Sequence, residues 1–250
     1  MPSKNLKTAA SNLKEVPEAF SVFDEARAVG AVDEGFTVYS RNQRAAVARL
    51  KPVKSGGLWF SVIIYPRQSA TTSPLLMLTT SLSVIEGIAK TTVLQPLLRW
   101  PNEISIHGNV VSSVAVEMEV VNDVITQGFA GSGIYVNTGP EEFRAEKEEG
   151  LSSLLVETGG TVNELVLLEN ILNAFENNYR LYKEGWRTEL LDKIRDVLEY
   201  VRTVVSINLA HGTQLIGFLE GLDDLGRMVL RVEQERIPLA PADVESISLF

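Results

Sequence analysis

The segment from Arg99 to Thr138 is rich in β-branched residues and is broken only by short turns. β-Branched side chains favour strands because they pack well on a pleated surface. Pro101 ends the first strand, since proline has no N–H to donate to a ladder, and the turn at 107–109 favours a hairpin. A sheet of strands that follow one another along the chain is therefore predicted. Its strands are expected at residues 97–100, 103–106, 110–119, 120–129 and 134–137.

The rest of the first 200 residues predicts helices that cover such a sheet. Ser21 is a potential N-cap of a short helix, and Thr161 with Glu164 three residues later forms a capping box. Helices are expected at residues 20–29, 75–92, 161–182 and 188–201, with 45–50 a further helical candidate, and strands at 36–39 and 58–65. Residues 1–15 are predicted to be a flexible N-terminus, and residues 141–150 an exposed loop or helical turn.

The character of the sequence changes near residue 202. Glycine, aspartate and proline mark tight turns between short β-rich stretches, a pattern typical of a small barrel. These strands are expected at residues 204–209, 213–222, 227–233 and 235–239. We therefore expect an α+β protein with a mixed sheet flanked by helices at 16–202 and a small barrel at 203–250.

Composition excludes several classes of function. The 250 residues include no cysteine and carry a net charge of −9, so disulfides, thiolate nucleophiles and cysteine-ligated metal sites are ruled out. An acidic chain lacks the clustered positive charge that binds nucleic acids or anionic membranes nonspecifically. The sequence contains no recognisable signal peptide and no apolar run near the ~20 residues that span a bilayer. We expect a cytoplasmic protein that binds neither nucleic acid nor membrane.

Three motifs give the sequence a family resemblance. Arg99-Trp100-Pro101-Asn102-Glu103 leads into the hairpin, Gly131-Ser132-Gly133-Ile134-Tyr135-Val136-Asn137 follows it, and Gly217 to Arg227 forms a glycine-punctuated hairpin. In this order they resemble biotin–protein ligases, whose first two motifs read Lys-Trp-Pro-Asn-Asp and Gly-x-Gly-x-Asn-x-Asn. The resemblance covers roughly residues 16–250 and implies the family's catalytic fold followed by its C-terminal SH3-like β-barrel. No helix-turn-helix precedes the core, so the DNA-binding repressor form is not expected.

The resemblance implies a two-step reaction. Biotin carboxylate attacks the α-phosphate of ATP to give biotinyl-AMP, and a lysine of a biotin carboxyl carrier-type protein then attacks the mixed anhydride. Cations must hold the two anions together, a glycine-rich loop cradles phosphate, and Mg takes oxygen ligands. Biotin and ATP-Mg would bind between residues 40–60 and the hairpin at 99–113. The candidate ligand-binding residues are Ser21, Arg44, Arg49, Gly56, Gly57, Arg99, Trp100, Asn102, Glu103, Ser112, Ser113, Gly131, Gly133 and Asn137.

Several residues that carry this chemistry in the family are replaced. The glycine-rich phosphate loop corresponds to residues 42–49, which contain no glycine and keep only Arg44 and Arg49 as cations. Val110 stands where the family has the lysine that engages the biotin carboxylate and phosphate, and Tyr135 replaces an asparagine. Losing one well-placed electrostatic donor typically costs about 10²–10³ in rate. We therefore predict an impaired or inactive ligase, with no catalytic residue assigned.

Three functional hypotheses remain open. The chain is a biotin–protein ligase-type protein, a noncatalytic scaffold that binds a protein partner, or a related acyl transferase acting on another acid, against which Val110 also argues. A homodimer through sheet edges is plausible by resemblance. No metal site is expected, because His107 and His211 are distant in sequence and neither has ligand spacing around it. The shape of the cleft distinguishes the hypotheses: filled by Phe23, Tyr39, Val110 and Tyr135, or empty and polar.

Overall fold

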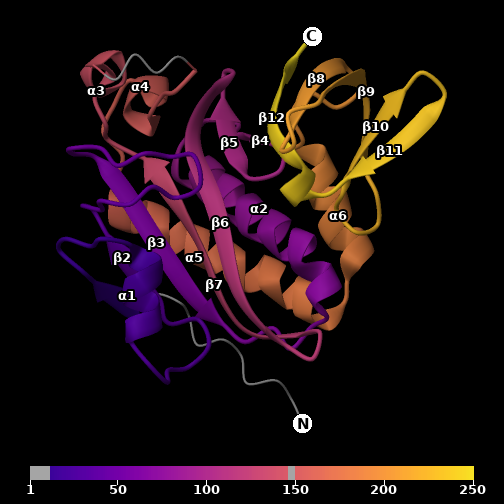
Figure 1. Cartoon of the computed structure of the whole chain (residues 1–250). Helices are drawn as coiled ribbons and strands as arrows, with labels where there is room; N and C mark the ends of the chain where they lie inside the picture. Colours follow the sequence, from indigo (N-terminus) through magenta and orange to yellow (C-terminus); the bar gives the residue numbers. More distant parts are fainter. Residues whose placement is uncertain (1–11, 146–149) are drawn as a thin grey trace.

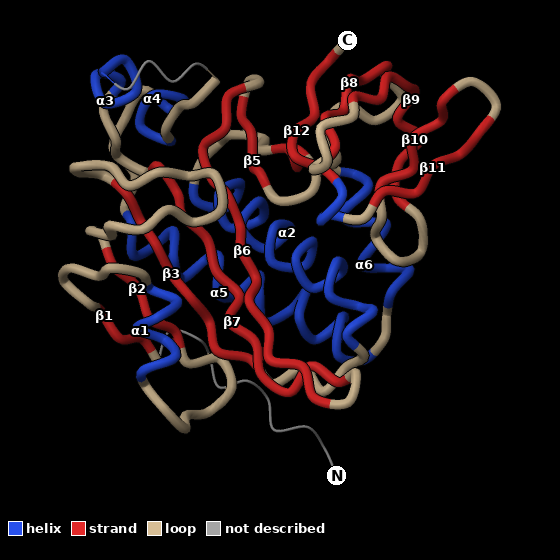
Figure 2. Tube along the Cα trace, in the orientation of Figure 1, coloured by secondary structure: helices blue, strands red, loops and turns tan. Residues whose placement is uncertain are grey.

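The computed structural model describes residues 12–145 and 150–250, in which one large sheet is covered by helices and a smaller sheet follows (Figure 1, Figure 2). The large sheet has the order β1-β2-β3-β7-β6-β5-β4. β1 is parallel to β2, and all other neighbouring strands are antiparallel. The predicted α+β class with a mixed sheet is confirmed. Its strands are β1 (Leu13–Glu15), β2 (Thr37–Ser40), β3 (Gly57–Ile64), β4 (Leu97–Arg99), β5 (Glu103–Ile106), β6 (Asn109–Val121) and β7 (Val124–Tyr135).

Helices cover both faces of this sheet. Helix α1 (Val22–Ala28) packs on one face, and α2 (Ser73–Thr91) with α5 (Glu164–Glu184) covers the other (Figure 1). Helices α2 and α5 approach closely at Gly87, where a Cβ atom would lie 2.3 Å from Ile171 Cγ1. Shorter helices are α3 (Pro140–Ala145), α4 (Leu154–Thr158) and α6 (Arg187–Asp196).

One segment meets the length and composition of a membrane span. The segment Ala70–Thr91, which includes α2, has a mean hydropathy of 1.2 over an 18-residue stretch, of which 67% is buried inside the structure. The sequence expectation that no apolar run is this long is therefore wrong. Helix α2 lies between the large sheet and α5, and its apolar side chains are part of the protein's core.

Three local predictions fail for identifiable reasons. Leu13–Glu15 is a strand rather than a flexible segment, because it pairs with Thr37–Tyr39 of β2. The stretch at 45–50 is not helical: Val47 and Leu50 exchange backbone hydrogen bonds of 3.0 and 2.9 Å around Ala48, whose φ of 49° is left-handed. Asn163, and not Thr161, caps α5, since its side chain accepts from the backbone N–H groups of residues 165 and 166.

The last predicted helix ends early. Helix α6 stops at Asp196 instead of residue 201, because the next residues pair with β4. Leu98 donates to Val197 over 2.7 Å and accepts from Glu199 over 2.8 Å. The segment that leaves α6 is thus tied to the edge of the large sheet.

The C-terminal strands form a five-stranded antiparallel sheet in the order β11-β10-β9-β8-β12. No ladder joins the two outer strands in the described residues, so the expected small SH3-like barrel is not closed. The strands are β8 (Val204–Leu209), β9 (Gln214–Leu222), β10 (Met228–Val232), β11 (Glu235–Leu239) and β12 (Val244–Leu249), with a 3-10 turn, η3 (Pro241–Asp243), before the last.

Replacing Gly87 by alanine is expected to destabilise the protein. Alanine favours helices by about 1 kcal/mol over glycine, but the added methyl would overlap the backbone and side chain of Ile171, and overpacking costs about 1–3 kcal/mol. We expect a net loss of up to about 2 kcal/mol in the free energy of unfolding, measured by urea denaturation. Gly160→Ala is the control, since a Cβ there meets nothing within 4 Å. Equal stability of the two variants would contradict close helix packing at Gly87.

Candidate functional site

The loop at 41–50 is held in place by hydrogen bonds from its own residues. The buried Gln43 accepts from the Val22 N–H over 2.8 Å and donates from Nε2 to the Ala45 carbonyl over 2.7 Å. Ser21 caps α1, accepting from the Phe23 N–H over 3.2 Å. Ala48 has a left-handed backbone conformation, which glycine adopts at lower cost. The loop therefore has a defined conformation and is fixed against the first residue of α1.

The cations predicted to bind anions are paired with carboxylates of the same chain. Arg44 is exposed and pairs with Glu18, away from the hairpin. Arg49 lies 3.2 Å from Glu103 of β5, a residue that is only 8% exposed. This second pair connects the loop at 41–50 directly to the hairpin.

Arg99 lies deepest among these cations. Its Nε donates to Glu199 over 2.8 Å and its Nη2 to the Gly108 carbonyl over 3.0 Å, and its guanidinium lies over the Tyr200 ring. Burial lowers the pKa of Arg99, but the hydrogen bonds to Glu199 and the nearby negative charges raise it more, so the net shift is upward. Arg99 therefore stays charged and connects β4 to the segment after α6.

Arg49, Arg99 and Glu103 border a cavity of about 670 Å³. Loop residues 46 and 48–51, the hairpin and strand β12 surround it, so both sheets contribute to its wall. Five of the predicted residues and positions line it: Arg49, Arg99, Glu103, Val110 and Ser113. The structure thus brings together the loop and the hairpin, as expected, and adds residues 246–248, which the sequence did not indicate.

Val110 occupies an apolar cluster. Its side chain is 6% exposed and clusters with Leu50, Tyr135 and Phe143. Its backbone accepts from Ser152 over 3.0 Å and donates to Gly150 over 2.8 Å. The Tyr135 and Phe143 rings lie 5.1 Å apart. The position expected to hold a cation therefore packs against aliphatic and aromatic carbon on one side and borders the cavity on the other.

The sheet face above Gly131 and Gly133 is filled by side chains of the protein itself. A Cβ atom at Gly133 would lie 2.9 Å from Trp59 Nε1 and 3.1 Å from Leu50 Cδ2, and one at Gly131 would lie 3.0 Å from Phe23 Cζ. The Trp59 ring also covers Gly57, where a Cβ would be 1.9 Å from Cη2. These glycines make room for packing within the sheet and against α1.

Three of the remaining candidates have structural hydrogen bonds. Gly56, with φ of 77°, accepts from the Val136 and Asn137 N–H groups over 2.9 and 2.7 Å. The Asn137 amide donates to the Val162 carbonyl over 3.0 Å and to Glu164 over 3.2 Å, and accepts from the Val162 N–H over 2.9 Å. Asn102 donates to the Val114 carbonyl over 2.8 Å.

Two neighbouring serines differ in their surroundings. The Ser112 hydroxyl lies 2.8 Å from the Ser132 hydroxyl and donates to the Gly133 carbonyl over 2.9 Å. The Ser113 hydroxyl and the Trp59 Nε1 are buried without a hydrogen-bond partner in the described residues. Both lie opposite Gly133 in the strand register, one on each side. Sequence reasoning missed Trp59, because a single tryptophan in an apolar strand carries no sign of its contacts.

Trp100 connects the two sheets. Its indole is 1% exposed, and its Nε1 donates to the Gly226 carbonyl of the C-terminal unit over 3.3 Å. In the described residues, no group of three or more histidine, aspartate or glutamate side chains could hold a metal ion.

Comparison with known proteins agrees with this arrangement. No protein family model matches the chain. It is 27% identical over 216 residues to the bifunctional ligase/repressor BirA of Bacillus subtilis, covering 85% of this chain and 66% of that protein. It superposes on the biotin protein ligase of Aquifex aeolicus in complex with biotin and ATP with a TM-score of 0.79 and 25% identity, covering 96% of this chain and 99% of that one.

In both sequence and fold the chain resembles biotin protein ligases. It spans about two thirds of the length of the curated relatives that it matches. A biotin protein ligase-like protein of unknown function from Silicibacter sp. TM1040 also shares the fold, with a TM-score of 0.72, 13% identity, and coverage of 92% of this chain and 94% of that one.

Replacing Glu199 by glutamine is expected to lower the free energy of unfolding by about 3 kcal/mol, because Arg99 would remain buried without its carboxylate. The double variant Arg99→Met with Glu199→Leu should recover most of this loss. Urea denaturation of the single and double variants measures both effects. Glu184→Gln removes the exposed partner of Arg180 and is the control, expected to cost under about 1 kcal/mol. A Glu199→Gln loss as small as the control's would refute the importance of this pair.

Proposed function

We propose that this chain is a biotin protein ligase family member that does not form biotinyl-AMP and acts instead as a noncatalytic partner-binding protein. The observation that carries the proposal is the packing of Phe23, Leu50 and Trp59 over the two strand glycines. In a protein of this fold that activates biotin, we expect an open space between the loop at 41–50 and the sheet. Here Phe23, Leu50 and Trp59 fill the part of that space above Gly131 and Gly133, and the remaining cavity lies between the loop, the hairpin and β12.

The residues of this chain do not fit a magnesium–nucleotide complex either. Magnesium requires several oxygen ligands in near-octahedral geometry, and Glu103 is the one carboxylate among the described residues lining the 670 Å³ cavity. Its charge is already offset by Arg49. The loop has no glycine to bring backbone N–H groups against phosphate. Neither ATP nor Mg is therefore assigned to this cleft.

An open strand edge supports a protein partner. β5 pairs with β6 at Asn109–Ser113, and Asn102 bonds to Val114. Beyond the hollow that Val116 and Met118 line, the far end of β6 has no strand paired on its outer side in the described part of the sheet. Val120 and Val121 at the end of this edge are 49% and 56% exposed. Unpaired edges pair readily with another chain. A carrier-type protein and a second copy of this chain both remain candidate partners.

Calorimetry with the purified chain tests the proposal. We expect no saturable heat from biotin, from ATP with magnesium, or from a nonhydrolysable biotinyl-AMP analogue at concentrations up to about 1 mM, above which binding free energies fall below about 4 kcal/mol. The biotin protein ligase of Aquifex aeolicus is the positive control. Micromolar binding of biotin or of the analogue, or transfer of radiolabelled biotin to a carrier protein, would refute the proposal.

The variant Val110→Lys tests whether biotin binding is lost because a lysine is missing or because side chains fill the pocket. Val110 borders the cavity, so a lysine there can extend its ammonium group toward solvent and the protein should still fold. We expect no biotin binding by this variant, because Trp59 and Leu50 still occupy the sheet face. Val110→Met, similar in length and uncharged, is the matched control. Biotin binding by the lysine variant alone would show that the pocket is accessible and lacks only its cation.

A further inference from the structure

A second cavity, of about 510 Å³, lies on the opposite side of the Arg49–Glu103 pair. It forms because β5 ends its pairing with β6 at Ser113, which leaves the outer side of β6 open. The start of α2 and the C-terminal sheet, from Ala240 to Ile247, close the hollow from the other sides. The same four residues, Arg49, Glu103, Ser246 and Ile247, line both cavities and form the wall between them.

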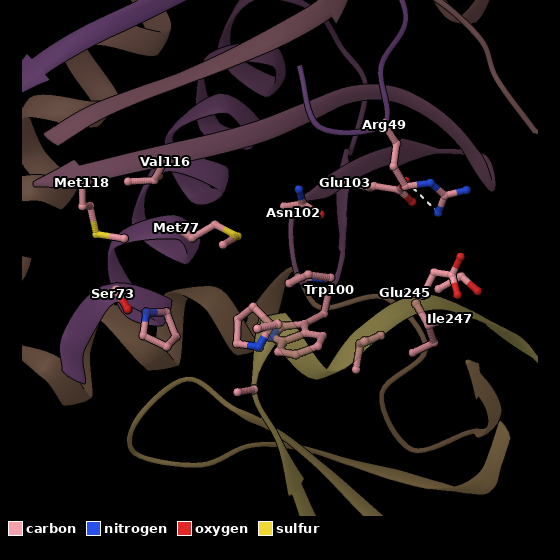
Figure 3. A pocket seen from close by; sticks show the side chains of 17 residues that line it. Arg49, Ser73, Met77, Trp100, Asn102, Glu103, Val116, Met118, Glu245 and Ile247 are labelled. Atoms are coloured by element: carbon pink, nitrogen blue, oxygen red, sulfur yellow. Dashed lines mark ion pairs between the residues drawn. The ribbon is translucent and has the colours of Figure 1, made fainter. Parts of the chain in front are cut away.

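The floor of this cavity is apolar. Met77, Trp100, Val116, Met118 and Ile247 line it from four different parts of the chain (Figure 3). All but Trp100 are half-buried, so these side chains present carbon and sulfur to the hollow. Methionine side chains adapt to varied apolar shapes and are frequent at binding surfaces. The floor therefore suits an apolar group without dictating one shape.

One end of the cavity is charged. Arg49, Glu103 and Glu245 lie together there, opposite Met77 and Met118 (Figure 3). Arg49 is paired with Glu103, whereas Glu245 is exposed and has no ion pair or side-chain hydrogen bond in the described residues. One negative charge is therefore left over beside an apolar floor.

We propose that this cavity binds a small organic amine that carries an apolar chain or ring. The apolar part lies on Met77, Met118 and Trp100, and the ammonium group pairs with Glu245. The volume is within the range of about 300–1,000 Å³ that small-molecule pockets have, and an ammonium group complements the residual negative charge. The inference does not depend on the loss of biotin activation, because Trp59 and the sheet glycines do not line this cavity.

Methionine-methyl NMR of the full chain tests the proposal, because the four methionines differ in position. Met77 and Met118 line the cavity, whereas Met228 is buried in the C-terminal sheet. Three probes share one apolar body and differ in the head group: 4-phenylbutylamine, 4-phenylbutan-1-ol and 4-phenylbutyrate. We expect the amine to shift the Met77 and Met118 methyl signals with the lowest Kd and to leave Met228 unchanged.

Two exposed variants test the charge. Glu245→Gln should weaken amine binding by about threefold, the size expected for an exposed ion pair, and leave binding of the alcohol unchanged. Glu235→Gln, also exposed but on β11 away from the cavity, should change neither. The proposal is overturned by equal Kd values for the three probes, by tighter binding of the carboxylate, by amine shifts confined to other methyl groups, or by no shift at all.

Discussion

The indole of Trp59 lies against Gly57 and Gly133, and the candidate site depends on this contact. The missing side chains on the two glycines admit the ring into the sheet, and Leu50 then packs on the same glycine from the loop. Burial of an aromatic ring contributes several kcal/mol through lost water contact. The loop at 41–50 is consequently fixed near the strands, and Val110, Tyr135 and Phe143 continue the same apolar packing.

Polar groups around this apolar packing also hold the elements of the fold together. Arg99 holds the segment after α6, Arg49 holds the loop on β5, and Asn137 holds the entry to α5. Each group bonds to a partner that is distant in the sequence. Arg49 and Arg99 border the 670 Å³ cavity, but both are already paired with carboxylates of the chain. Here their hydrogen bonds stabilise the connections between elements, which agrees with the proposed noncatalytic role.

The elements that the sequence predicts well are those set by local pattern. The apolar stretch that forms β3, the Ser21 cap of α1 and the hairpin of β5 and β6 follow from residues close together in the chain. β1 and the end of α6 do not, because each depends on pairing with a distant strand. The replacement of the family lysine by Val110 is visible in the sequence. The filling of the sheet face by Trp59 is not, since it depends on which side of β3 faces Gly133.

Trp100 gives the two sheets a shared interior. Its indole is covered by the C-terminal unit, and Gly226 of that unit in turn lies close to Leu78 of α2. The change of strand pattern near residue 202 therefore separates two sheets, but the buried apolar side chains are continuous across it. A fragment cut at that point would expose the large aromatic ring of Trp100. Such a piece would be prone to self-association, because the smaller sheet would no longer cover this apolar surface.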